Sequence, residues 1–187
     1  MQKRIITLSG LPGTGKSSTA RGVADALHYT RFSSGDFMRQ LGTDRGMTID
    51  QMQLAAEADP SIDEAIDSAL RAKNEESDLV IDSRIAFHWL PESFKVLLTL
   101  DPKVAAHRTY KQIHQSNERL NQEAADEAEI YKNILRRIES EKLRYKKLYN
   151  IDYPTPSDFD LVIDTENHPL SEVIAMVLEA YSAWLSQ

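Results

Sequence analysis

The sequence predicts an α/β fold in which a five-stranded parallel sheet is flanked by helices. Five short apolar segments, each about as long as one strand, alternate with segments whose apolar residues have helical spacing. Strands joined through helices run parallel, because an antiparallel pair needs only a short turn. The 187 residues, of which 41% are hydrophobic, suit a single domain, and we expect residues 1–187 to form it.

The first strand is expected at residues 5–8, a short run rich in β-branched side chains. A glycine-rich turn occupies residues 9–15. The helix after it is indicated by apolar residues at helical spacing: Ala20, Val23, Ala24 and Leu27. Residues 29–33 are assigned as the second strand. Ser34 is expected to cap the following helix, since serine is a preferred N-cap residue.

The middle of the chain, residues 43–76, contains no strand pattern. Pro60 is typical of a first helical turn, and the helix that it begins has an apolar face made of Ile62, Ala65, Ile66, Ala69 and Leu70. The third strand is expected at residues 79–81 and the fourth at residues 94–100. Asp101 and Pro102 then begin a new helix.

The last third of the chain is expected to contain a long charged helix from about Ala124 to Tyr149. Pro154 and Pro156 end its pattern. The fifth strand is expected at residues 161–163. A closing amphipathic helix follows, with an apolar face made of Leu170, Val173, Ile174, Val177, Leu178, Tyr181 and Leu185.

Composition excludes several classes of function. The net charge is −7, which argues against binding nucleic acid or anionic membranes through the whole surface. The chain has no cysteine, so disulfides and thiolate chemistry are excluded. No apolar run approaches the ~18 residues of a membrane span, and the N-terminal apolar stretch is too short for a signal peptide. We therefore expect a cytoplasmic protein, and a monomer because no heptad seam is visible.

Residues 10–17 match the pattern G-x-x-x-x-G-K-[ST] of the phosphate-binding P-loop. Its glycines let backbone N–H groups surround phosphate oxygens, its lysine reaches the β- and γ-phosphates, and its hydroxyl can ligate Mg²⁺. The residues expected to hold the nucleotide are Gly10, Gly13, Thr14, Gly15, Lys16, Ser17 and Ser18. The dinucleotide fingerprint G-x-G-x-x-G fails, because Ser18 stands in place of its third glycine. The motif therefore predicts the P-loop nucleoside triphosphatase fold.

The third strand ends in a carboxylate, Asp82, which is expected to orient Mg²⁺ together with Ser17. Arg84 follows two residues later, in the crevice where open α/β sheets bind ligands. A guanidinium group there suits a second phosphate, because it binds phosphate oxygens through two donors. The alternative is a surface arginine in a salt bridge.

Residues 33–39, with the sequence SSGDFMR, resemble the motif [ST]-G-D-x-x-R of the nucleoside monophosphate kinases. The resemblance implies that Ser34 and Arg39 contact the acceptor nucleotide, with Arg39 on its phosphate. It also implies that Asp36 lies near the region of Mg²⁺ and the phosphates. The alternative is a capped helix whose arginine faces water.

The long helix carries a basic cluster. Residues 131–149 contain seven Lys or Arg against two Glu, so this segment has a local charge of +5 and suits an anionic ligand. Arg137, Glu141 and Arg144 share one helical face, being four and three residues apart. The alternative is a solvated charged face.

Nearly the whole chain resembles the short cytidylate kinases. The likeness is carried by residues 139–152, 55–63, 80–84, 100–108 and 161–165. It implies an acceptor-nucleotide insert at about residues 34–76 and a lid at about residues 108–153. It also implies that Arg108 stacks on the donor adenine, that Arg137 and Arg144 act on the transferring phosphoryl group, and that Glu141 contacts Arg144 or the ribose.

The expected activity is transfer of the γ-phosphoryl group of ATP, with Mg²⁺, to a pyrimidine nucleoside monophosphate such as CMP or dCMP. Lys16, Arg84, Arg137 and Arg144 would be its catalytic side chains. The expected partners are small nucleotides, with no nucleic acid and no membrane. Three alternatives stay open: another nucleoside monophosphate as acceptor, a P-loop kinase of another small metabolite, and a nucleotide-gated binding module without phosphotransfer.

Overall fold

The computed structural model describes residues 3–115, 126–152 and 155–186. Its sheet has five parallel strands in the order β2-β3-β1-β4-β5. The strands are β1 (Ile5–Gly10), β2 (Thr30–Ser33), β3 (Leu79–Asp82), β4 (Phe94–Thr99) and β5 (Leu161–Asp164). The predicted fold class is confirmed, and each strand lies within two residues of its predicted ends.

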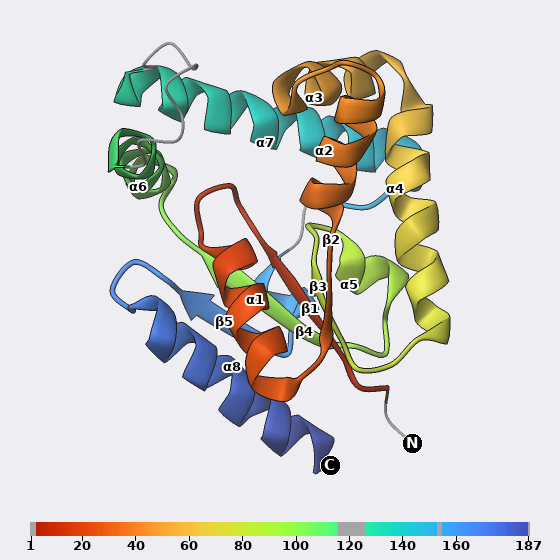
Figure 1. Ribbon diagram of the computed structural model, residues 1–187, viewed down its shortest axis with the longest axis vertical. Coiled ribbons are helices and arrows are strands. Elements are labelled where there is room, and N and C mark those ends of the chain that lie inside the picture. The colour runs from red at the N-terminus through yellow and green to blue at the C-terminus, as the bar shows by residue number, and fades with distance from the viewer. Residues whose placement is uncertain (1–2, 116–125, 153–154, 187) are drawn as a thin grey trace.

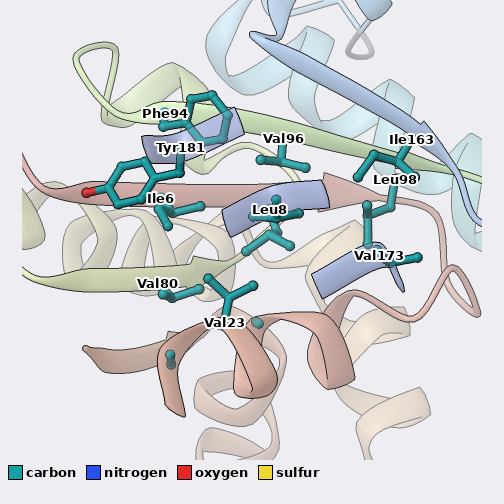
Figure 2. Close-up of a cluster of buried hydrophobic side chains, with 13 residues drawn as sticks. Ile6, Leu8, Val23, Val80, Phe94, Val96, Leu98, Ile163, Val173 and Tyr181 are labelled. Atoms are coloured by element: carbon teal, nitrogen blue, oxygen red, sulfur yellow. The ribbon is translucent and has the colours of Figure 1, made fainter. Parts of the chain in front are cut away.

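Helices α1 (Lys16–Leu27) and α8 (Leu170–Leu185) cover one face of the sheet (Figure 1). Alternate strand residues point to the same face, and Figure 2 shows Ile6 and Leu8 of β1 meeting Val23 of α1 and Val173 of α8 in one buried cluster. The predicted apolar faces of both helices are therefore the faces that pack on the sheet, except that Leu170 and Leu185 at the two ends of α8 are exposed.

Four helices cover the opposite face: α2 (Ser34–Asp44), α3 (Ile49–Ala58), α4 (Pro60–Ala72) and α5 (Ala86–Trp89). A 3-10 turn, Lys73–Glu75, follows α4. The second core lies between these helices and the other side of β1 and β3, represented by Ile5 and Ile81. Pro60 does begin a helix, and the Asp59 side chain caps it by accepting a hydrogen bond from the N–H of Ser61 at 3.0 Å.

Helices α6 (Pro102–Gln115) and α7 (Glu127–Tyr149) pack on each other beyond the carboxyl end of the sheet. In Figure 1, α7 crosses the top of the view from α6 toward α2, α3 and α4. A 3-10 turn, Pro156–Asp158, precedes β5. The predicted start of α7 at Ala124 and the break at Pro154 lie outside the described residues; the Asp126 side chain caps the observed helix.

The predicted cap of α2 is wrong by one residue. Ser33, and not Ser34, is the N-cap: its hydroxyl accepts a hydrogen bond from the N–H of Asp36 at 3.3 Å. Ser33 keeps the extended conformation of β2, which an N-cap residue requires, whereas Ser34 is already the first helical residue. The hydroxyl of Ser34 instead donates to the backbone oxygen of Asp82 at 3.4 Å.

In the part of the chain that the structure describes, the helices are too short or too polar to span a lipid bilayer.

Candidate active site

The turn between β1 and α1 is open on the side that faces solvent. Gly13 and Gly15 have φ values of +82° and +86°, a backbone conformation that favours glycine. A Cβ at Gly13 would lie 2.9 Å from the Cβ of Ala105, whereas a Cβ built at Gly15 has no described atom within 4 Å apart from those of Gly15 and its two chain neighbours. Gly15 also caps α1, whose first N–H groups have no partner within the helix. Open space beside free N–H groups is what a phosphate requires.

Lys16, the first residue of α1, lies inside this turn, and its Nζ donates a hydrogen bond to the backbone oxygen of Leu11 at 2.9 Å. Burial and the nearby positive charge of Arg84 lower the pKa of Lys16 to about 7. Arg137 acts in the same direction, and the carboxylates of Asp82 and Glu141 oppose the shift. The pKa of the lysine is therefore affected by the charges of two arginines from distant parts of the chain.

The two residues predicted to orient Mg²⁺ are in contact. The hydroxyl of Ser17 donates to Oδ2 of Asp82 at 2.5 Å, and the hydroxyl of Ser33 lies 3.5 Å from the same oxygen. Parallel pairing places Ser33 directly beside Asp82 at the carboxyl ends of β2 and β3. Mg²⁺ prefers carboxylate, hydroxyl and water oxygens, so this donor set fits the ion, with water completing its coordination.

Glu141 joins the two guanidinium groups near Lys16. It is 3% exposed, and its carboxylate lies 2.5 Å from Nε of Arg84 and 3.0 Å from Nε of Arg137. Arg137 and Glu141 are one helical turn apart on α7, whereas Arg84 follows β3. Burial and the charge of Arg84 lower the pKa of Arg137. Glu141 therefore aligns Arg84 with Arg137, a different arrangement from the predicted contact with Arg144.

Arg144 lies toward α4. Its Nε is 3.5 Å from Oδ2 of Asp63, and both side chains are buried. Burial raises the pKa of Asp63 to about 6, even though Arg144 acts to lower it; Asp67 and Glu141 add to the increase. The two predicted lid arginines thus have different partners: Arg137 pairs with Glu141, and Arg144 pairs with Asp63 of the predicted acceptor insert.

Asp36 and Arg39 form an exposed cluster with Arg31. Asp36 accepts hydrogen bonds from both arginines, at 2.5 Å from Arg31. Partial burial would raise the pKa of Asp36, but the bonds from Arg39 and Arg31 outweigh it and hold this pKa below its usual value. The Arg39 guanidinium lies 3.8 Å from where a Cβ of Gly35 would be, and Gly35 lines the central pocket. Arg39 itself does not line that pocket and is exposed.

Arg108 of α6 is held at the end of β5. Its Nη2 donates to the backbone oxygens of Thr165 and Glu166 at 2.7 and 2.9 Å. The hydroxyl of Thr165 in turn donates to the backbone oxygen of Thr14 at 3.2 Å. The residue predicted to stack on adenine is thus connected to the glycine turn through one intervening side chain.

The central pocket lies where α2, α4 and α7 meet the end of β3. It is lined by Ser34, Gly35, Met38, Gln53, Asp63, Ile66, Asp67, Ser83, Arg84, Ile85, Arg137, Glu141, Arg144 and Tyr145. Sequence reasoning did not assign Gln53, Asp63 and Asp67 to a site. A signal existed: Asp63 and Asp67 are the charged positions on the apolar stripe that begins at Ile62.

A sequence profile described as an AAA domain matches residues 9–126. The cytidylate kinase of Methanothrix thermoacetophila is 35% identical over 179 residues, a match covering 96% of this chain and 98% of that protein. The cytidylate kinase of Haloarcula marismortui is 34% identical over 184 residues, covering 96% and 90%. The chain belongs to the cytidylate kinase family. The resemblance inferred from the motifs is thereby confirmed, and the fold is that of a P-loop kinase.

One relative of this chain is a larger protein. The S-adenosylmethionine-dependent nucleotide dehydratase of Lacinutrix mariniflava is 34% identical over 181 residues, which cover 96% of this chain but 36% of that protein. Among solved structures, the shikimate kinase of Bacteroides thetaiotaomicron superposes with a TM-score of 0.63 at 14% identity, covering 96% of this chain and 97% of that one. This structural likeness shows the shared fold alone.

Proposed function

We propose that this chain transfers the γ-phosphoryl group of ATP to the 5′-phosphate of a pyrimidine nucleoside monophosphate, CMP or dCMP. The observation that carries the proposal is that the charges of Arg84 and Arg137 act on Lys16 of the glycine turn, while both arginines line a pocket on the side of residues 34–76. Two phosphate groups brought end to end repel each other, and three cations at their junction offset that repulsion. The cytidylate kinase relatives support the choice of acceptor.

In the reaction, an oxygen of the acceptor phosphate forms a bond to the γ-phosphorus, and the bond from that phosphorus to the β–γ bridging oxygen breaks. The products are ADP and a nucleoside diphosphate. A phosphate monoester has a second pKa of ~6, so the attacking oxygen is already ionised at neutral pH. No strong general base is required, and catalysis consists of alignment and charge neutralisation.

On the donor side, the loop amides and Lys16 would hold the ATP phosphates, and Arg108 would lie against the adenine. Ser17 and Asp82 would hold Mg²⁺, Asp82 through a water. When bound, Mg²⁺ supplies further neutralisation of the phosphate charge.

On the acceptor side, Arg84 and Arg39 would bind the acceptor phosphate, with Ser34 and Asp36 at the start of α2. Arg137 would neutralise the group in transfer, and Arg144 of α7 would approach it from the side of α4. The insert at residues 34–76 and the lid at residues 108–153 would close over the nucleotides. Closure excludes water, which would otherwise accept the phosphoryl group.

An acceptor panel tests this function. The purified chain is incubated with ATP and Mg²⁺ and one acceptor at a time: CMP, dCMP, UMP, AMP, shikimate or gluconate. ADP release is recorded, and the phosphorylated product is identified by chromatography. We expect CMP and dCMP to give the highest kcat/KM. Turnover with a sugar acid alone would assign a metabolite kinase, and ATP binding without acceptor-dependent ADP would assign a binding module.

A further inference from the structure

Thr165 lies directly after β5, where the sheet, the glycine turn and α6 meet. The residue is 3% exposed. Its N–H donates to the backbone oxygen of Thr99 at 3.0 Å, which extends the pairing of β5 with β4 by one residue beyond Asp164. The branched Cβ of threonine restricts its side-chain rotamers. Both the backbone and the hydroxyl of Thr165 are therefore held in one orientation.

The hydroxyl of Thr165 connects the glycine turn to α6. It donates to the backbone oxygens of Thr14 at 3.2 Å and Thr99 at 3.3 Å, which share its one proton. It also accepts a hydrogen bond from Nη1 of Arg108 at 3.4 Å. One buried side chain thus contacts both the phosphate-binding turn and the arginine that the proposed function places against adenine.

Helix α6 supports the same turn at a second point. Ala105, three residues before Arg108 on α6, packs closely against Gly13. The turn is therefore supported from the protein side at residues 13 and 14, whereas the next residue, Gly15, has open space beside it.

The contact with Thr14 fixes the direction of one amide of the turn. The peptide bond between Thr14 and Gly15 is trans, so its C=O and N–H point in opposite directions. Because the oxygen points to the Thr165 hydroxyl, the N–H of Gly15 points away from Thr165. Thr14 is 1% exposed, and a buried backbone oxygen needs a partner. Loss of the hydroxyl would remove such a partner and loosen this peptide.

We propose that Thr165 is a positioning residue of the donor site. Its hydroxyl sets the direction of the Gly15 amide that binds an ATP phosphate, and it connects that amide to Arg108 at the adenine. Thr165 acts through these two groups and not by contact with a reacting atom. The inference rests on the proposed function for its donor, ATP, and is independent of the acceptor.

The test compares the full-length wild type with Thr165→Val, which nearly keeps the shape but loses the hydroxyl, and with Thr165→Ser, which keeps the hydroxyl. Calorimetry with Mg²⁺ measures the Kd of ATP and of tripolyphosphate, a ligand with phosphates but no base. We expect Thr165→Val to raise both Kd values ~10-fold and Thr165→Ser to stay within ~2-fold of the wild type, because one aligning hydrogen bond is lost or kept. KM for ATP should rise in the same proportion, with KM for CMP unchanged.

Thr7→Val is the matched control. Thr7 of β1 is also fully buried, and its hydroxyl lies 3.0 Å from that of Ser93, before β4. This variant loses a buried hydrogen bond of the same sheet that has no part in the glycine turn. Its free energy of unfolding should fall, as measured in urea, while both Kd values remain those of the wild type.

Thr165→Ala removes the same hydroxyl with a smaller side chain and reports where the valine variant does not fold. Wild-type ATP affinity in either folded variant overturns this inference alone, and so do equal losses in Thr165→Val and Thr165→Ser. A wild type that binds no ATP overturns the proposed function and this inference with it. Weakened ATP binding in Thr165→Val, without turnover of any nucleoside monophosphate by the wild type, overturns the proposed function only.

Discussion

Positive charge is in excess where the proposed phosphates meet. Lys16, Arg84 and Arg137 face the carboxylates of Asp82 and Glu141, three cations against two anions. Lys16 has the lowest ordinary pKa of the three cations; burial first, and then the nearby arginine charges, lower its pKa to about 7, while the arginines stay charged. A bound triphosphate would reverse the balance.

This balance predicts that ATP binding takes up a proton. In the free protein the pKa of Lys16 is about 7 instead of 10.5, so at pH 8.5 the amine is mostly neutral. The negative phosphates favour its charged form, so binding raises this pKa and captures up to one proton. Calorimetry of ATP binding at pH 8.5, in two buffers with different ionisation enthalpies, measures the uptake directly.

The control that assigns this proton uptake to Lys16 is the variant Lys16→Arg. Arginine keeps the positive charge but cannot lose its proton at this pH. Uptake should disappear in that variant. Equal uptake by the wild type and the variant would show that the proton goes elsewhere.

Arg84 is the next residue whose role is measurable. Its guanidinium, aligned by Glu141, faces the acceptor phosphate in the proposed reaction. Arg84→Ala should lower kcat with CMP by ~10²-fold or more, because a preorganised donor at the reacting group is lost. ATP affinity should stay nearly unchanged. Arg21→Ala, which removes an exposed arginine of α1, should leave both quantities alone; unchanged turnover in Arg84→Ala would remove this residue from the mechanism.

At the scale of single elements, α7 determines where the arginines lie. It carries Arg137, Glu141 and Arg144 on one side, and Ile130, Ile134 and Ile138 on the side that packs against α6. The position of the arginines therefore depends on an apolar seam that contains no polar group of the site.

Ile134→Ala tests this dependence. The side chain is 6% exposed, and shortening it should reduce the free energy of unfolding by about 2–4 kcal/mol. We also expect kcat to fall, because a loosened α7 misplaces Arg137. Leu143→Ala on the same helix is the control: Leu143 is 70% exposed, and its loss should change stability by less than ~0.5 kcal/mol. Urea unfolding and CMP turnover check both variants, and wild-type kcat in Ile134→Ala would contradict the idea.

Elements with a strong local pattern could be predicted, and elements without one could not. The strands were found because buried parallel strands are continuous apolar runs, as in residues 79–81. Helix α3 was missed because only Met52 and Ala56 are buried along it, too few to mark a face. The cap of α2 was misplaced because Ser33 and Ser34 are equally good capping residues, and only the backbone conformation of Ser33 distinguishes them.

The residues of the candidate site likewise include some that a local sequence pattern predicts and others that it does not. Lys16, Ser17 and Asp82 follow from a local motif and the end of a strand, and Ser17 does contact Asp82. The pairing of Glu141 with Arg84 joins segments 57 residues apart, and no local pattern encodes it. Asp63 and Asp67 resemble solvent-exposed charges until α4 is seen to pack them inward.

At the scale of the whole molecule, the two cores on opposite faces of the sheet carry one tryptophan each. The chain has two tryptophans. Trp89 lies between α4 and the end of α7, with its ring 5.3 Å from that of Tyr149 and the Arg71 guanidinium 4.7 Å above it. Trp184 packs on Phe94 and Tyr181 on the opposite face of the sheet. The two side chains therefore report on different halves of the structure.

This separation predicts that the two tryptophans respond differently to CMP. Closure of α3, α4 and α7 over the acceptor would change the surroundings of Trp89, while the core around Trp184 stays packed. In Trp184→Phe, which retains Trp89, the emission should shift as CMP saturates the protein. In Trp89→Phe, which retains Trp184, it should stay constant within a few per cent. A CMP-dependent shift confined to the variant that retains Trp184 would place the acceptor, or the motion that follows its binding, on the other side of the sheet.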